Sequence, residues 1–195
     1  MRVPHHDIDV MFLDRWSPRA FTGEDVPVGD LERMLEAARW APSAFNRQPW
    51  RFAYATRRSE SWPVFLELLI PFNQSWAQNA GALIFVASVS TFFNAEKQEY
   101  ETSPTHSFDA GAAWGYLALQ ARRLNWYAHG MAGFDSERAH SVLGAAPEMR
   151  MEAAIAIGRL ADKSVLPERM QAREAPSDRM PIADLAQYGR FSGDR

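Results

Sequence analysis

The sequence predicts an α+β fold in which helices pack around a sheet. A continuous apolar run of strand length, residues 82–89, indicates a strand covered on both faces. A long helix rich in small residues is expected over residues 108–124. The other predicted strands and helices do not alternate strictly, and no G-x-G-x-x-G turn is present. The last two features disfavour a doubly wound nucleotide-binding sheet and favour an α+β sandwich.

Composition limits the class of protein. The 195 residues fit one domain over residues 1–195, with an N-terminal extension (1–12) and an extended C-terminal segment (161–195). A net charge of −3 gives no basic excess for nucleic acid or a membrane surface. Cysteine is absent, which excludes disulfides and thiolate chemistry. With no signal-like start and no apolar run long enough to span a bilayer, we expect a soluble cytoplasmic protein.

The first half of the chain provides most of the predicted sheet. Residues 30–40 have helical periodicity with Asp30 as the expected N-cap, and residues 50–56 alternate as a strand does. A helix is expected over 61–69, with Pro63 in its first turn. The polar stretch 94–107 is predicted to be a mobile loop or lid.

The second half begins with the helix over 108–124, whose small residues predict a closely packed helical partner in the core or across a dimer interface. Asp135 is expected to cap a helix over 136–143, and residues 151–160 predict a strand that ends at Gly158. Three prolines prevent the tail after residue 160 from forming one regular element.

The loop W-A-P-S-A-F-N-R-Q-P-W at residues 40–50 is the most informative segment. Pro42 and Pro49 stiffen it, and it displays Ser43, Asn46 and Gln48 between them. A rigid loop of neutral hydrogen-bonding side chains suits a flat heterocycle with donors and acceptors on its rim. The alternative is that these residues only end the helix and connect it to the next strand.

Several segments in order resemble the nitroreductase family of FMN-dependent oxidoreductases. They are R-x-S-x-R-x-F at residues 15–21, A-P-S-A-x-N-x-Q-P-W at 41–50, F-D-A-G-A-A at 108–113, M-A-G-F-D at 131–135, A-A-I-A-I-G at 153–158 and S-D-R-M-P-I at 177–182. The resemblance implies a three-layer α/β/α sandwich with a mixed, mainly antiparallel sheet. It also implies a homodimer with FMN at the subunit interface.

The resemblance implies which residues contact FMN. Arg15, Ser17 and Arg179 would hold the phosphate and ribityl end, and Arg19 the pyrimidine edge, where a cation stabilises reduced flavin. The main chain of Ala132 and Gly133 would face flavin N5. The full expected cofactor set is Arg15, Trp16, Ser17, Arg19, Pro42, Ser43, Ala44, Asn46, Gln48, Asn73, Met131, Ala132, Gly133 and Arg179. Solvated arginines and a plain helix-end Asn73 are the competing interpretations.

Two positions depart from the family pattern. Ser177 stands where a second basic residue is common, and Trp76 stands where some members have lysine; we expect a stacking or pocket-wall role for Trp76. No catalytic side chain is expected, because the flavin performs the chemistry. His129 is expected to be structural, and His5 and His6 lack further ligands, so no metal site is predicted.

The function implied is ping-pong transfer of hydride from NAD(P)H through FMN to a small electron-poor acceptor, such as a nitroaromatic or a quinone. One alternative is a protein that binds or handles flavin without NAD(P)H reductase activity. Another is a flavin-dependent dehydrogenase or dehalogenase on the same fold. No nucleic-acid or membrane partner is expected.

Overall fold

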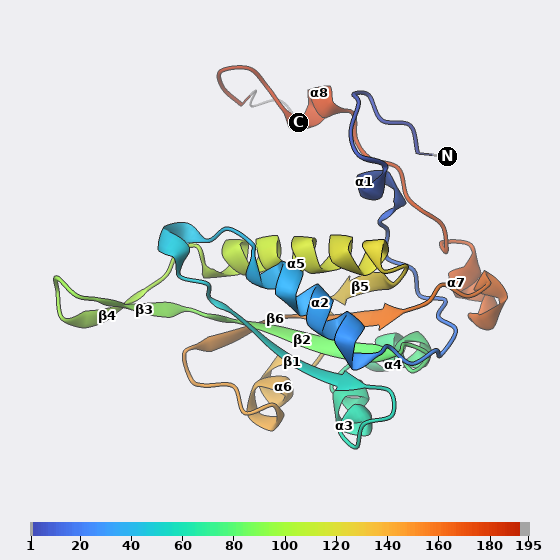
Figure 1. Cartoon of the computed structure of the whole chain (residues 1–195), viewed down its shortest axis with the longest axis horizontal. Coiled ribbons are helices and arrows are strands. Elements are labelled where there is room, and N and C mark those ends of the chain that lie inside the picture. Colours follow the sequence, from blue (N-terminus) through green and yellow to red (C-terminus); the bar gives the residue numbers. More distant parts are fainter. Residues whose placement is uncertain (1, 192–195) are drawn as a thin grey trace.

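The structure is a computed structural model that describes residues 2–191, and these residues form three layers (Figure 1). The central sheet has the order β1 (Trp50–Thr56), β2 (Ala82–Val89), β6 (Met149–Gly158) and β5 (Tyr127–Met131). Its pairings are antiparallel. One face carries α2 (Val28–Arg39) and α5 (His106–Arg123), and the other carries α3 (Trp62–Glu67), α4 (Pro71–Ala77) and α6 (Ser136–Val142). The predicted α+β sandwich with a mainly antiparallel sheet is confirmed.

Strand β2 divides the hydrophobic core in two, because its side chains alternate between the faces of the sheet. Ile84 and Val86 pack with α2 and α5, whereas Leu83 and Phe85 pack with α3 and α4. Seven of its eight positions are buried, as the continuous apolar run predicted. Strand β5 was missed from the sequence because it is only five residues long and contains His129 and Gly130.

The small residues of α5 lie on two faces with different roles. Ala110, Ala113 and Ala121 are buried against α2 and the sheet, which confirms close packing within the core. Gly111 and Gly115 lie on another face, where an added Cβ would meet nothing within 4 Å. Part of this helix is therefore left uncovered by its own chain.

The expected helix caps are partly confirmed. Asp135 caps α6 by accepting a hydrogen bond from the N–H of Arg138, and Pro63 lies in the first turn of α3. Asp30 as an N-cap is wrong, because α2 begins two residues earlier, after Pro27. The Asp30 carboxylate instead accepts a hydrogen bond from Nε1 of the buried Trp126, at 2.8 Å, and so ties α2 to the end of α5.

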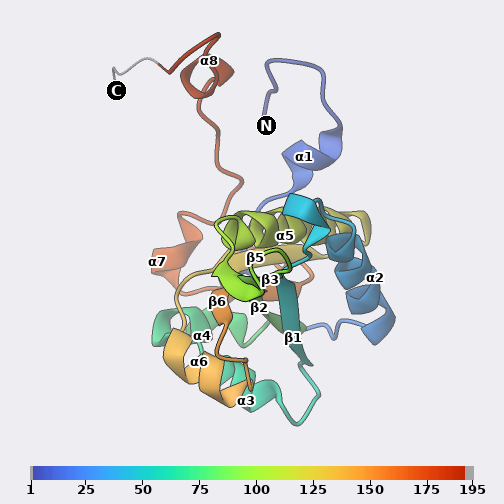
Figure 2. The ribbon, with the colours of Figure 1, turned by 90° about the vertical axis from the view of Figure 1, so that its left-hand side faces the viewer.

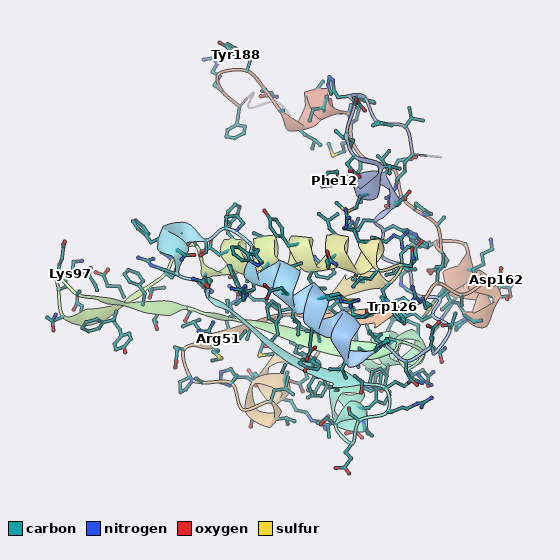
Figure 3. All side chains as sticks on the ribbon, in the orientation of Figure 1. Phe12, Arg51, Lys97, Trp126, Asp162 and Tyr188 are labelled. Atoms are coloured by element: carbon teal, nitrogen blue, oxygen red, sulfur yellow. The ribbon has the colours of Figure 1, made fainter. Side chains whose placement is uncertain are left out.

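The stretch over residues 94–107 is not the irregular loop predicted from the sequence. Strands β3 (Thr91–Asn94) and β4 (Glu99–Thr102) form a paired hairpin, and α5 begins at His106. A Phe93–Tyr100 ring contact and a Lys97–Glu101 ion pair hold the hairpin together. Lys97 lies at the tip of the hairpin, far from the body of the protein (Figure 3). The polar residues of this stretch suggested a loop, but they are polar because both faces of the hairpin are exposed to solvent.

Both ends of the described chain form arms on one side of the body (Figures 1 and 2). The N-terminal arm contains α1 (Val10–Asp14), and the C-terminal arm passes through η2 (Lys163–Val165), α7 (Glu168–Gln171) and α8 (Ile182–Leu185). Nε of Arg2 donates to the carbonyl of Ser177 at 2.9 Å and so joins the arms. Phe12 and Tyr188 project from them with exposed rings (Figure 3).

Candidate functional site

A cavity of about 460 Å³ lies between α5 and the strands β5 and β6. Arg15 and Ser17 lie at one end, and Glu152 lies toward the first turn of α5, where it contacts Ser107. Most of the lining residues between them are small, so few bulky side chains line this stretch. The lining residues are Arg15, Ser17, Trp114, Gly115, Ala118, Gly130, Met131, Ala132, Glu152 and Ala153.

Positive charge gathers at the arginine end of this cavity. The pKa of the Arg15 guanidinium is lowered by burial and then by the charges of Arg179 and Arg2. Arg2 donates from Nη1 to the carbonyls of Leu13 and Arg15, at 2.8 and 2.9 Å, so it fixes this backbone. Mutually repelling guanidinium groups form a site that an anion would stabilise. No sequence motif pointed to Arg2, because it lies in the N-terminal arm, outside every motif.

The turn between Ser17 and Arg19 is held from two sides. The Glu174 carboxylate accepts hydrogen bonds from the N–H groups of Arg19 and Ala20, at 2.6 and 2.9 Å. The Arg19 guanidinium lies 3.8 Å from the same carboxylate and does not line the cavity. His129 Nδ1 lies 2.8 Å from the carbonyl of Pro18. This turn therefore presents Ser17 to the cavity while Arg19 faces the C-terminal arm.

His129 and Trp76 form the support beneath this turn. Burial lowers the pKa of His129, although the hydrogen bond to Pro18 opposes that shift. A neutral ring with its proton on Nδ1 satisfies the Pro18 carbonyl, which agrees with the expected structural role. Trp76 is 1% exposed and its ring centroid lies 4.6 Å from that of His129. The expected pocket-wall role of Trp76 is wrong, because α4 directs this ring into the core.

The end of β5 brings main chain to the cavity. Gly130, Met131 and Ala132 line it, whereas Gly133 does not. A Cβ at Gly130 would approach the Trp114 ring to 3.1 Å, so glycine keeps that wall close to the helix. Asn73 Nδ2 donates to the Gly133 carbonyl at 2.9 Å, and the side chain is buried within α4. Asn73 thus braces the turn that follows the cavity wall.

The polar loop at residues 42–48 does not line this cavity. Phe45, Asn46 and Gln48 have φ values of 53°, 54° and 49°, a left-handed geometry that costs roughly 1–2 kcal/mol per residue. The N–H of Ala44 donates to Asp109 at 3.2 Å, which fixes the loop beside the first turn of α5. Its 3₁₀ turn, η1 (Ala44–Asn46), presents an exposed Phe45.

Nine of the fourteen expected cofactor residues therefore fall into two groups, one toward each end of α5. Pro42, Ser43, Ala44, Asn46 and Gln48 lie at the start of the helix. Arg15, Trp16, Ser17 and Arg19 lie toward its end, where Trp16 packs edge-on against Tyr127. A helix of 18 residues is about 27 Å long. Within this protomer, the loop at residues 42–48 does not line the cavity that contains Arg15 and Ser17.

Comparison with known proteins decides the family. The Nitroreductase family model matches residues 13–72. A Streptomyces coelicolor protein described as a candidate NADH dehydrogenase/NAD(P)H nitroreductase is 32% identical, over 69% of this chain and 73% of its own. The chain belongs to the nitroreductase family. A Thermus thermophilus protein named NADH dehydrogenase is 29% identical, over 92% of this chain and 95% of its own.

Solved structures share the fold of this family member. One, described as an oxidoreductase containing FMN, has a TM-score of 0.96 and 51% identity, covering 99% of this chain and 97% of its own. A candidate nitroreductase of Desulfovibrio desulfuricans in complex with FMN has a TM-score of 0.70 and 25% identity, covering 93% and 96%. Among residues 2–191, no helix is long and apolar enough to cross a membrane.

Proposed function

We propose that this nitroreductase-family protein is an FMN-dependent oxidoreductase that transfers electrons from NAD(P)H to a small electron-poor acceptor, such as a nitroaromatic or a quinone. The observation that carries the proposal is the cavity that has Arg15 at one end and mostly small residues along its wall. The names of the relatives support both the cofactor and the electron donor.

The residues of the cavity fit FMN by their chemistry. Arg15 and Ser17 line the cavity and offer a cation and a hydroxyl for a phosphate dianion, and the charges of Arg179 and Arg2 act on Arg15 from nearby. Each shielded charge-assisted hydrogen bond of this kind contributes roughly 1.5–3 kcal/mol. The volume of about 460 Å³ lies within the usual range for small-molecule sites. When bound, FMN would supply reversible two-electron chemistry between the nucleotide and the acceptor.

Each part of the chain then has a role in binding. Arg15 and Arg179 neutralise the phosphate, and Arg2 holds the Arg15 backbone and Ser177 in place, so it offsets the missing basic residue at position 177. Gly130 and Ala132 let main chain approach a planar ring. Because donor and acceptor would use one opening in turn, ping-pong kinetics follow.

A homodimer completes the proposed site. The loop at residues 42–48 is fixed beside Asp109 and does not line the cavity that contains Arg15, so it would contact the cofactor of a second protomer. The accessible surface of one chain is 12098 Å², whereas a compact monomer of 22.1 kDa has about 9,300 Å². The excess of about 2,800 Å² is comparable to the area buried in an obligate dimer.

The decisive experiment is purification followed by spectroscopy and turnover. We expect a yellow protein that releases FMN on heating and oxidises NADH or NADPH when a quinone is added. A colourless protein that ignores added FMN would refute the cofactor. A protein that binds FMN but oxidises neither nucleotide would refute the reductase activity and favour a flavin-handling role.

Substitution of Arg15 tests the phosphate end. Arg15→Ala should weaken FMN binding by roughly ten- to a hundredfold, as expected from one charge-assisted hydrogen bond. Arg33→Ala is the matched control, because this substitution also removes one arginine charge, but from the solvent-exposed face of α2. Fluorescence titration of the FMN-free variants gives both affinities. Equal affinities would place the phosphate elsewhere.

A further inference from the structure

A β-bulge places a carboxylate at the end of the cavity opposite Arg15. Val86 of β2 pairs with Ala153 of β6, but the next residue, Ala87, pairs with Met151. Glu152 is therefore the extra residue of β6 and has no partner on β2. Bulges of this kind redirect side chains and are frequent beside active sites. Here the bulge turns Glu152 toward the cavity and the first turn of α5.

Glu152 is one end of a hydrogen-bonded chain. Its Oε1 atom accepts from Ser88 Oγ at 2.6 Å and from Ser107 Oγ at 2.7 Å. Ser88 Oγ also lies 2.7 Å from Nδ1 of His106. A serine hydroxyl has one proton, so when Ser88 donates to Glu152, His106 must donate from Nδ1 to Ser88. The three groups form a continuous path for a proton.

The path connects two cavities. Glu152 lines the cavity described above, whereas His106 lines a second cavity of about 580 Å³. Ser88 lies between them and is 0% exposed. The second cavity is lined by Ser90, His106, Ser136, Glu137, His140, Pro147, Met149, Arg150 and Met151. Protons from water at His106 can therefore reach the first cavity without passing through its mouth.

We propose that His106, Ser88 and Glu152 form a proton relay that protonates the acceptor during its reduction. The relay rests on the proposed function and adds a proton donor to a reaction in which the flavin was expected to act without a catalytic side chain. Protonated His106 passes its Nδ1 proton to Ser88 as Ser88 passes its own proton to Glu152. Glu152 then gives that proton to the acceptor, and His106 is reprotonated from water. Each transfer moves one proton and changes no other bond in the protein.

The proton balance of a nitro group shows why the relay is needed. Reduction of a nitro group to a nitroso group consumes two electrons and two protons, breaks one N–O bond and releases that oxygen as water. A hydride equivalent supplies two electrons and one proton, so one more proton must come from elsewhere. Glu152 is the carboxyl group that lines the cavity where the acceptor would bind.

Other charges surround the relay and would tune it. Arg150 Nε lies 3.7 Å from Glu152 Oε2. His140 and Glu137 line the cavity at His106, and Asp109 lies one turn along α5. Arg15 is the cation at the far end of the first cavity. The pH dependence of acceptor reduction will therefore report several coupled groups rather than one.

The first test uses the FMN-free protein and needs no turnover. Nitrogen-15 NMR of labelled histidines gives the tautomer of each neutral ring, and His106→Gln identifies the His106 signal. We expect neutral His106 to hold its proton on Nδ1 and to lose that preference in the double variant Ser88→Ala/Ser107→Ala, because Ser107 Oγ also lies 3.4 Å from Nδ1. A ring protonated on Nε2 in the native protein, unaffected by the double substitution, would overturn the relay.

The second test compares acceptors in the FMN-loaded protein. Nitrobenzene needs the extra proton, whereas ferricyanide accepts electrons alone. In Glu152→Gln, the rate of nitrobenzene reduction relative to ferricyanide reduction should fall by about 10²-fold, the usual contribution of a general acid. Glu148→Gln removes an exposed carboxylate nearby and should leave that ratio unchanged. An unchanged ratio in Glu152→Gln would refute the relay, whereas a native protein inactive with both acceptors would refute the proposed function instead.

Discussion

Glu174 should be a main source of stability for the turn that carries Ser17. Its side chain is 2% exposed, and Oε1 accepts the N–H groups of Arg19 and Ala20 at 2.6 and 2.9 Å. Glu174→Ala leaves both donors without a partner, and each buried unsatisfied donor costs roughly 1–3 kcal/mol. The lost ion pair adds little, because the Arg19 side chain is 27% exposed and 3.8 Å away. We expect a loss of about 4 kcal/mol in the free energy of unfolding.

Arg19→Ala is the matched control for this prediction. It removes the ion pair but keeps both main-chain hydrogen bonds to Glu174, so it should cost about 1 kcal/mol or less. Urea unfolding at fixed protomer concentration gives both values. If the two variants lose equal stability, or if Glu174→Ala loses less than about 1 kcal/mol, the main-chain bonds do not carry the stabilisation.

Three further predictions follow from the site and the arms. Burial lowers the pKa of His129, so its contribution to stability is complete above about pH 6.5 and is lost as the pH falls. Below that pH, the free energy of unfolding of the native protein should fall more steeply than that of His129→Gln, by up to about 1.4 kcal/mol per pH unit. The same pH dependence in both proteins, measured by urea unfolding, would contradict this. Gly111→Leu should leave the protomer folded but shift sedimentation equilibrium toward monomer, because nothing in its own chain lies within 4 Å of an added Cβ; an intact dimer would exclude this helix face from the interface. Arg2→Ala should raise the proteolytic sensitivity of the C-terminal arm, because the Ser177 contact is lost; an unchanged cleavage rate would show that other contacts hold the arm.

The sequence predicted the layers of the fold because its strongest patterns are local. The apolar run at β2 and the small-residue helix α5 are each long enough to identify without tertiary information. Helix α4 was missed, because seven residues that include Asn73 and Gln74 give too short a pattern. The hairpin β3–β4 was mistaken for a loop, because a hairpin without a buried face lacks the apolar alternation of a half-buried strand.

The site was partly predictable for a different reason. Family motifs placed Arg15, Ser17, Met131 and Ala132 together, and the structure brings them to one cavity. No motif linked Glu152 to Ser88, since the two residues are 64 positions apart and meet only through the register of β2 and β6. Contacts of this kind depend on strand pairing, which sequence periodicity does not specify.

Because Glu152 is the extra residue of a bulge, deletion of its single codon would give a protein with a regular β6 and no relay. Deletion of that codon would let Ala153 and Met151 become adjacent in a regular ladder with β2, because Glu152 has no partner there. The preceding part of β6 would keep its pairing, since Ser88 already pairs with Arg150. A strand of ordinary geometry would remain, but without a carboxylate in the cavity. The relay could thus be gained or lost in evolution by a single-residue insertion or deletion that leaves the rest of the sheet in place.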